Sequence, residues 1–257
     1  MSRVEILGVE FDAVDLDSAA EQIASAAAAT GPHLVVTANV EMVMLARHTP
    51  DLREILRTAS FVVADGVGVV WGSRQLGTPL PGRIPGIDLA GRLCQEAVRR
   101  GWRVYVLGGV PGIADAAAAR LRAWYPGLHI VGTACGYFST GEEPRVIQAI
   151  REAAPTLLLA GLGAPRQERW LARHLSALAV PVAMGIGGSL DVWAGRARRA
   201  PRVWQTFGLE WCYRLVREPR RFARQLAIPH FMSVIFAVKL RRFIRRFARR
   251  GRPGGAR

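Results

Sequence analysis

The chain has 257 residues, of which 50% are hydrophobic and 21% charged, enough for one large domain or a domain with an appendage. The net charge of +15 is concentrated, because the last 44 residues hold fourteen of the 35 Lys and Arg but only one of the 20 acids. The remaining body is nearly neutral, which excludes a basic stripe across it for nucleic acid. Three scattered cysteines, Cys94, Cys135 and Cys212, without a C-x-x-C pair favour a reducing compartment.

The first hundred residues alternate short apolar runs with helical patterns. We expect a strand or hairpin at 4–11 and strands at 33–37 and 61–64, with helices at 19–29, 40–48, 51–59 and 87–100. Asp17 and Ser18 are candidate caps of the first helix. The Gly- and Pro-rich stretch 67–87 is expected to be a loop, with an active-site loop at 79–86.

The following residues repeat a strand–turn–helix unit. Strands are expected at 103–107, 129–133, 156–160 and 180–184, and helices at 113–125, 142–153 and 166–178. Short apolar strands that alternate with helices are typical of a mainly parallel sheet, so the fold class is α/β. A linker at 194–201 then leads to basic C-terminal helices. The N-terminus lacks the long apolar run of a signal peptide.

Three of the turns after strands are rich in glycine, at 108–112, 161–165 and 185–188. Ligands of open parallel sheets bind at the carboxyl ends of the strands, where glycine lets backbone amides approach a phosphate. The turns, Gly108 and Gly109 among them, therefore favour a nucleotide crevice over plain tight turns. A full G-x-G-x-x-G and a P-loop are both absent, which weighs against a dinucleotide or P-loop site.

Polar residues end two of the buried strands. Asp65 follows 61–64 and precedes Gly66, which allows either an ordinary turn residue or a carboxylate held as a general base. Thr37 and Asn39 close the strand at 33–37 in the same way. All three are expected to face one crevice.

Further polar residues lie near the later turns. Gln167 falls in the first turn of the helix at 166–178, and Asp191 follows the turn at 185–188. Asp15 and Asp17 have the D-x-D spacing of a metal site, but they directly precede a helix and are better explained as helix-capping residues. The five histidines are scattered, so we expect neither a catalytic metal nor a cofactor.

The C-terminal region carries two cationic patterns. Arg214, Arg217, Arg221 and Arg224 share one helical side if Pro219 does not interrupt it, which favours an anionic partner such as a pyrophosphate. Farther on, apolar residues repeat along one helical face while basic residues take the rest. That apolar face comprises Phe236, Leu240, Phe243, Ile244 and Phe247.

A basic amphipathic helix of this kind is typical of attachment to an anionic membrane surface. The apolar stretch at 231–238 is far shorter than the roughly 20 residues of a spanning helix. A nucleic-acid arm is the rival interpretation, but it would not need large apolar residues on one face. We therefore expect membrane binding and no nucleic-acid partner.

Three segments together resemble the WecG/TagA/CpsF glycosyltransferase family. They are GLGAPRQERW at 161–170, GIGGSLDVWAGRARRAP at 185–201 and GLEWCYRLVREPRR at 208–221, and the TAN, ADG and GGVPG segments agree in order and spacing. The resemblance covers about residues 5–226. It implies a Rossmann-like body, residues 1–200, and a basic helical membrane-docking appendage, residues 201–257.

The resemblance also implies an activity. Such enzymes move a sugar, often N-acetylmannosamine or its uronate, from a UDP-sugar donor to a polyprenyl-diphosphate-linked sugar acceptor, with inversion and without a metal. They work at the cytoplasmic face of the plasma membrane and supply teichoic acid, common antigen or exopolysaccharide. The donor, the polymer and any homo-oligomer are not specified by this sequence.

The resemblance also implies roles for individual residues. Asp65 matches the proposed base, and crevice positions match Thr37, Asn39, Arg83 and Gln167. The appendage arginines thought to engage diphosphate match Arg214, Arg221 and Arg224. The tail after Gln225 is longer and more basic than in shorter members.

Two other functions are weighed against this one. A nucleotide-cofactor oxidoreductase could use the same sheet, although the fingerprint and the ribose-binding acid are missing. A non-catalytic nucleotide-binding protein with a lipid-docking tail would tolerate Asp65→Ala without loss of any property.

Overall fold

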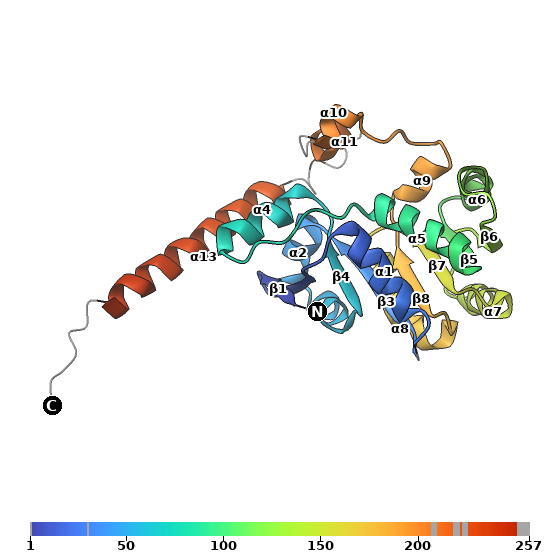
Figure 1. The fold of residues 1–257 in the computed structure, drawn as a ribbon, viewed down its shortest axis with the longest axis horizontal. Helices are drawn as coiled ribbons and strands as arrows, with labels where there is room; N and C mark the ends of the chain where they lie inside the picture. The colour runs from blue at the N-terminus through green and yellow to red at the C-terminus, as the bar shows by residue number, and fades with distance from the viewer. Residues whose placement is uncertain (1, 30, 207–209, 218–221, 223–225, 251–257) are drawn as a thin grey trace.

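The structure is a computed structural model, and it describes residues 2–29, 31–206, 210–217, 222 and 226–250. Its centre is a six-stranded, fully parallel sheet with the strand order β4-β3-β8-β7-β5-β6 (Figure 1). The strands are β3 (His33–Ala38), β4 (Phe61–Ala64), β5 (Arg103–Gly108), β6 (His129–Ala134), β7 (Leu157–Gly161) and β8 (Val182–Gly185). The predicted α/β class with a mainly parallel sheet is confirmed.

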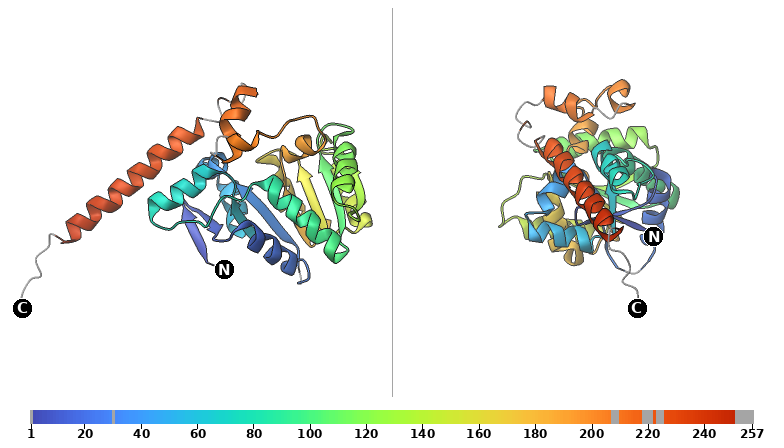
Figure 2. Two further views of the ribbon diagram at one scale, coloured as in Figure 1. Left: turned by 45° about the horizontal axis from the view of Figure 1, so that its top comes forward. Right: turned by 90° about the vertical axis from the view of Figure 1, so that its left-hand side faces the viewer.

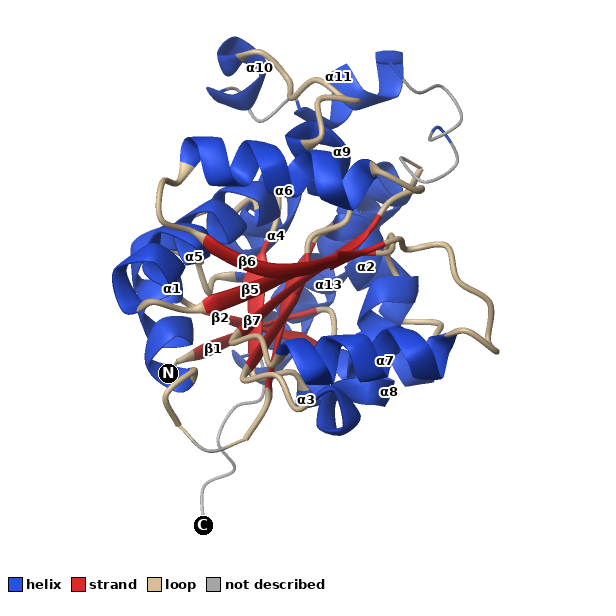
Figure 3. Ribbon diagram, turned by 90° about the vertical axis from the view of Figure 1, so that its right-hand side faces the viewer, coloured by secondary structure: helices blue, strands red, loops and turns tan. Residues whose placement is uncertain are grey.

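Helices cover both faces of this sheet (Figure 3). One face carries α1 (Leu16–Ala26), α5 (Gly86–Arg100), α6 (Ile113–Trp124) and α9 (Ser189–Trp193). The other carries α2 (Val40–Ala46), α3 (Pro50–Thr58), α4 (Val67–Leu76), α7 (Glu143–Ala153), α8 (Arg166–Leu178) and the antiparallel hairpin β1 (Arg3–Ile6)–β2 (Val9–Asp12).

The strand residues divide between two hydrophobic cores by simple alternation. Val35 of β3 packs with α1 and α5, whereas its neighbours Leu34 and Val36 pack with the helices of the other face. Successive side chains of a strand point to opposite faces, so a strand buried on both sides is apolar throughout. This explains why the apolar runs in the sequence are continuous rather than alternating with polar residues.

The cap of the first helix is Asp15 rather than Asp17 or Ser18. Its carboxylate accepts a hydrogen bond from Ser18 N at 2.8 Å, and Asp17 lies within the first turn, paired with Arg92. Both acids of the D-x-D pattern therefore have structural partners. The helix-capping explanation of this motif is confirmed, with the capping residue shifted by two positions.

One expected loop is wrong in its first half. Residues 67–76 form helix α4, and only the stretch up to Pro85 is a loop. The glycines there serve close packing: a Cβ on Gly72 would lie 2.7 Å from Cζ of Phe231, and one on Gly68 would lie 2.6 Å from Val40 Cγ2. Gly77, with φ of 85°, ends the helix in the left-handed conformation that glycine adopts easily.

The C-terminal region forms α10 (Arg202–Thr206), α11 (Glu210–Arg217) and the long helix α13 (Ala227–Arg250). Helix α13 begins against α4 and α2, where Phe231 and Ile235 are fully buried, and then extends away from the body (Figures 1 and 2). Within the part of the chain that the structure describes, no helix is long and apolar enough to span a membrane.

The predicted apolar face of the tail is exposed where its side chains are described. Phe236, Leu240 and Ile244 have about half of their surface open to solvent, as Met232 does to a lesser degree. Phe236 also packs edge-on against Trp71 of α4, with ring centroids 5.6 Å apart. The side chains of Phe243 and Phe247 lie outside the described part of the structure.

Candidate active site

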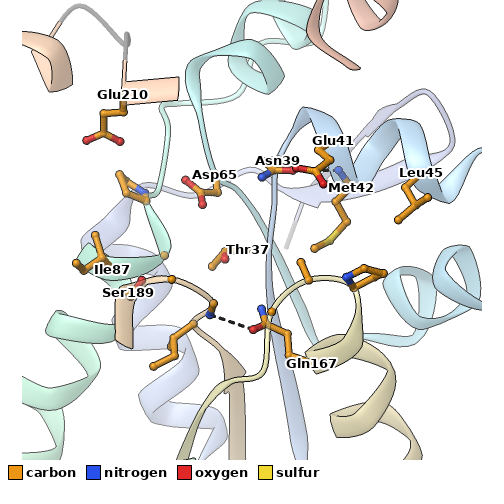
Figure 4. Close-up of a pocket in the computed structure, with 18 residues that line it drawn as sticks. Thr37, Asn39, Glu41, Met42, Leu45, Asp65, Ile87, Gln167, Ser189 and Glu210 are labelled. Carbon is orange, nitrogen blue, oxygen red and sulfur yellow. Dashed lines mark hydrogen bonds between the residues drawn. The ribbon is translucent and has the colours of Figure 1, made fainter. Parts of the chain in front are cut away.

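A pocket opens at the carboxyl ends of four neighbouring strands, β4, β3, β8 and β7 (Figure 4). Four of the predicted crevice residues line it together: Thr37, Asn39, Asp65 and Gln167. This is the edge of a parallel sheet at which ligands of such folds bind. The remaining lining residues are Glu41, Met42, Leu45, Pro85, Gly86, Ile87, Gly163, Ala164, Pro165, Ile186, Gly187, Gly188, Ser189 and Glu210.

Asp65 is placed by the strand pairing of β3 and β4. Its backbone N–H donates to Ala38 O at 2.9 Å, and Gly66, with φ of 109°, turns the chain directly afterwards. The carboxylate is half-buried and faces the pocket (Figure 4).

Thr37 and Asn39 leave β3 next to Asp65. Asn39 also caps α2, because its Oδ1 accepts from Met42 N at 3.0 Å. Thr37 lies under the start of α5, where a Cβ on Gly86 would come within 2.9 Å of Thr37 Oγ1. The absence of a side chain at Gly86 thus lets the helix start close to the pocket.

Gln167 lines the opposite side of the pocket, and Glu168 is its neighbour and hydrogen-bond partner. Gln167 Oε1 accepts from Gly187 N at 3.0 Å, and its Nε2 donates to Glu168 Oε1 at 2.7 Å. Both side chains are buried, and burial raises the pKa of the Glu168 carboxyl despite the hydrogen bond from Gln167. Glu168 was not among the predicted site residues, since nothing in the pattern distinguishes it from an ordinary first-turn acid.

A cluster of charged residues borders the pocket on the side of Asp65. Arg83 Nη1 lies 3.2 Å from Glu210 Oε2, and its Nη2 donates to Gln205 O at 2.8 Å. Arg83 therefore joins the loop before α5 to both α10 and α11. It is not itself among the pocket-lining residues.

Arg199 completes this cluster with a two-pronged ion pair to Asp88, at 2.6 and 2.7 Å. Partial burial lowers the pKa of Arg199, but the hydrogen bonds to Asp88 and the charges of Asp88, Glu210 and Asp65 together outweigh it, so the pKa is raised. Arg199 and Glu210 were both missed by the sequence analysis. The signal for Glu210 was its position as the single acid beside two arginines in GLEWCYRLVR.

Other predicted residues lie apart from the pocket lining. Gly108 ends β5 and Gly109 follows it; a Cβ on Gly108 would lie 2.4 Å from Gly161 O, so close backbone packing explains that glycine. Asp191 is in α9, and its carbonyl accepts from Arg196 N at 2.9 Å. The side chain of Arg214 and the whole of Arg221 and Arg224 lie outside the described residues.

In the described part of the chain, no three His, Cys, Asp or Glu side chains are grouped so that they could hold a metal ion. The positive groups near the pocket are guanidinium groups. The pocket thus combines carboxylates and a buried amide at the ligand-binding edge of a Rossmann-like sheet, with ion-paired arginines at its border.

Comparison with known proteins gives the family. The model of the glycosyl transferase WecG/TagA/CpsF family matches residues 4–245, and the chain belongs to this family. It is 35% identical over 240 residues to proteins from Staphylococcus aureus strains MW2 and NCTC 8325, which covers 93% of this chain and 94% of each relative. Both relatives are named N-acetylglucosaminyldiphosphoundecaprenol N-acetyl-beta-D-mannosaminyltransferase.

Proposed function

We propose that the protein is an inverting glycosyltransferase that moves an N-acetylmannosamine-type sugar from a UDP-sugar to a polyprenyl-diphosphate-linked sugar. The observation that carries the proposal is the half-buried Asp65, which lines one pocket with Thr37, Asn39 and Gln167 in a chain 35% identical to the two transferases. The names of those relatives supply both the sugar and the lipid-linked acceptor. Teichoic acid or a related cell-surface polymer would be the destination of the product.

Asp65 acts as the general base in this proposal. It takes the proton of the acceptor hydroxyl as that oxygen attacks the anomeric carbon, and the bond from that carbon to the UDP oxygen breaks on the opposite face. The new glycosidic bond therefore has the inverted configuration. Positioned proton transfer of this kind contributes roughly 10²–10⁴-fold to a rate.

The negative charge that develops on departing UDP needs a cationic partner. Arg83 borders the pocket, and the family resemblance adds Arg214, Arg221 and Arg224 of the C-terminal region. Guanidinium groups pair with phosphate oxygens in a two-pronged geometry and keep their charge at all relevant pH values. In this proposal arginines supply the charge stabilisation, and the reaction needs no metal.

The C-terminal region, residues 201–257, serves as a membrane-docking appendage in this proposal. The exposed side chains of Phe236, Leu240 and Ile244 line α13, which is otherwise rich in Lys and Arg. Apolar insertion and attraction to anionic lipid together hold such helices at an interface. The protein would thus meet its lipid-linked acceptor on the inner face of the plasma membrane.

A donor screen tests the proposal. Purified protein receives a short-chain lipid-diphosphate-GlcNAc and a panel of UDP-sugars, with EDTA present, and product is followed by mass spectrometry. Transfer from one donor that falls at least 100-fold in Asp65→Asn is expected. The matched control is Asp51→Asn, which removes a surface carboxylate of α3 that pairs with Arg169 of α8. This variant should transfer sugar at the rate of the wild type.

Each other outcome has a defined meaning. Transfer that persists in Asp65→Asn would remove Asp65 from the role of base. Transfer that stops with EDTA and returns with a divalent cation would overturn metal independence. UDP binding without transfer from any donor would support the nucleotide-binding protein as the alternative.

A further inference from the structure

Gln167 lies across the carboxyl end of β8 and joins two of the glycine-rich turns that line the pocket. Its backbone N–H donates to Gly163 O at 2.9 Å in the turn after β7, while its side chain accepts from Gly187 N in the turn after β8. The fit is close, since a Cβ on Gly185 would lie 2.6 Å from Gln167 Nε2. The side chain is thus held between the two turns rather than free to rotate.

The two hydrogen bonds of the amide define which end is oxygen and which is nitrogen. Gly187 N–H is a donor in every protonation state, so the group facing it must be the amide oxygen. Glu168 Oε1, 2.7 Å from the nitrogen, accepts from it. If the amide were turned over, two donors would meet at Gly187, and the amide and carboxyl oxygens would meet at Glu168. Both neighbours therefore select the same orientation.

This orientation leaves one side-chain N–H of Gln167 available to a ligand in the pocket. A side-chain amide has two N–H hydrogens, and only one is used by Glu168. Figure 4 shows Gln167 on the far side of Thr37 from Asp65, with the tip of its side chain inside the pocket. The remaining hydrogen suits an acceptor atom on a ligand.

Glu168 has no other described function that would explain its burial. Its side chain is 2% exposed, and Oε2 has no hydrogen-bond partner within the described residues. Burying a carboxyl group with an unsatisfied oxygen destabilises a protein. The burial of a carboxyl group beside a pocket-lining residue is explained if the carboxyl group orients that residue.

We propose that Glu168 is a positioning residue that fixes the Gln167 amide with one N–H directed into the pocket, so that Gln167 recognises a hydrogen-bond acceptor on the substrate. The acceptor is an oxygen of the sugar, such as a hydroxyl or the acetamido carbonyl, or an oxygen of the phosphate. This assignment rests on the proposed function for the identity of the substrate. The orientation of the amide itself does not depend on it.

A double-mutant cycle tests whether Glu168 acts through Gln167. The variants are Glu168→Met, Gln167→Met and the combination, assayed for transfer from the donor found in the screen. Each single change should lower kcat/KM at least about tenfold, and Glu168→Met should have no further effect in the Gln167→Met background. Glu168→Gln, which keeps an acceptor, should stay within about threefold of wild type.

The matched control removes a partly buried carboxylate that pairs with a residue of α8. Glu143 pairs with His174 at 3.0 Å, away from the pocket, and Glu143→Met should leave kcat/KM near wild type. Melting temperatures of all variants show whether folding accounts for a loss. Multiplicative effects of Glu168→Met and Gln167→Met, or a loss that follows the melting temperature alone, would overturn the proposal.

A second measurement does not require activity. The side-chain amide signals of Gln167 are identified in a ¹⁵N–¹H spectrum as the pair missing from Gln167→Met. In the wild type the two hydrogens should be well separated in shift, and Glu168→Met should move them toward the values of a free glutamine. Unchanged signals in Glu168→Met would overturn the positioning role, whereas failure of the wild type to transfer any sugar would count only against the proposed function.

Discussion

The two ends of helix α13 have opposite environments. Its first turns pack in the core of the body through Phe231 and Ile235, whereas Leu240 and Ile244 farther along are more than half exposed. The stripe that faces the body also changes character, because Arg242 follows Ile235 on that side and donates to Leu76 O at 3.0 Å, at the end of α4. One continuous helix thus has an anchored start and a projecting end.

This difference shows why the hydrophobic pattern of a helix does not identify its partner. Large apolar side chains occur at both ends at helical spacing, but the apolar side chains at the start fill space created by Gly72. Those at the end have no body surface to cover them (Figure 2). Two changes to α13 can sharpen or break this contrast, and two further changes test the surroundings of the pocket.

The largest effect should come from the anchored start. Phe231→Ala empties a fully buried site and should lower the free energy of unfolding by about 3–5 kcal/mol. Ile244→Ala at the projecting end should change it by less than about 0.5 kcal/mol. Urea unfolding of both variants measures the difference. Equal effects would mean that the two ends are not distinct in the folded protein.

The next largest effect should be on lipid binding, when apolar side chains at the projecting end of α13 are replaced. Leu240→Ser with Ile244→Ser should weaken binding to anionic vesicles by roughly tenfold or more, since less apolar surface enters the interface. Trp124→Ser on α6, which replaces an equally exposed apolar residue of the body, is the matched control. Vesicle co-sedimentation at two salt concentrations would reveal the electrostatic part. A variant that binds as wild type would exclude α13 as the docking element.

The stability of the protein is expected to depend on pH through Glu168, the neighbour of the pocket-lining Gln167. Burial raises the folded-state pKa of Glu168 above its ordinary 4.5, so the folded state binds this proton more tightly than the unfolded state does. The stabilisation is present below the ordinary value and is lost as the pH rises through the folded pKa. Glu168→Gln should therefore melt higher relative to wild type at pH 7 than at pH 4. If the difference in melting temperature between Glu168→Gln and the wild type were the same at pH 4 and pH 7, the raised pKa of Glu168 would be contradicted.

The smallest effect should arise where α11 meets the pocket. Glu210→Gln removes the ion pair with Arg83 and should cost about 1 kcal/mol or less, seen as faster hydrogen exchange in 202–206 and 210–217. Glu54→Gln, which breaks the exposed pair with Arg57, should leave exchange in these segments unchanged. Unaltered exchange in Glu210→Gln would show that this ion pair does not hold the segment.

Much of the body could be predicted from the sequence because its causes are local. Continuous apolar runs defined the parallel strands, and Thr37, Asn39, Asp65 and Gln167 could be assigned to one crevice because each follows or adjoins a strand end. The capping role of the D-x-D acids followed from their place before a helix. The helix α4 was missed, because its glycines resemble loop residues until the side chains that pack against them are known.

Only the tertiary structure decided how distant segments meet. Arg83 and Glu210 are 127 positions apart in the sequence, and Gln167 is separated by 20 from the Gly187 amide that orients it. Likewise, periodicity gave the helical faces of α13, but the fit of Phe231 into the space beside Gly72 determined which face is covered. Secondary structure follows from interactions between near neighbours in the chain, whereas the orientation of an amide or an ion pair depends on packing between segments that the sequence does not bring together.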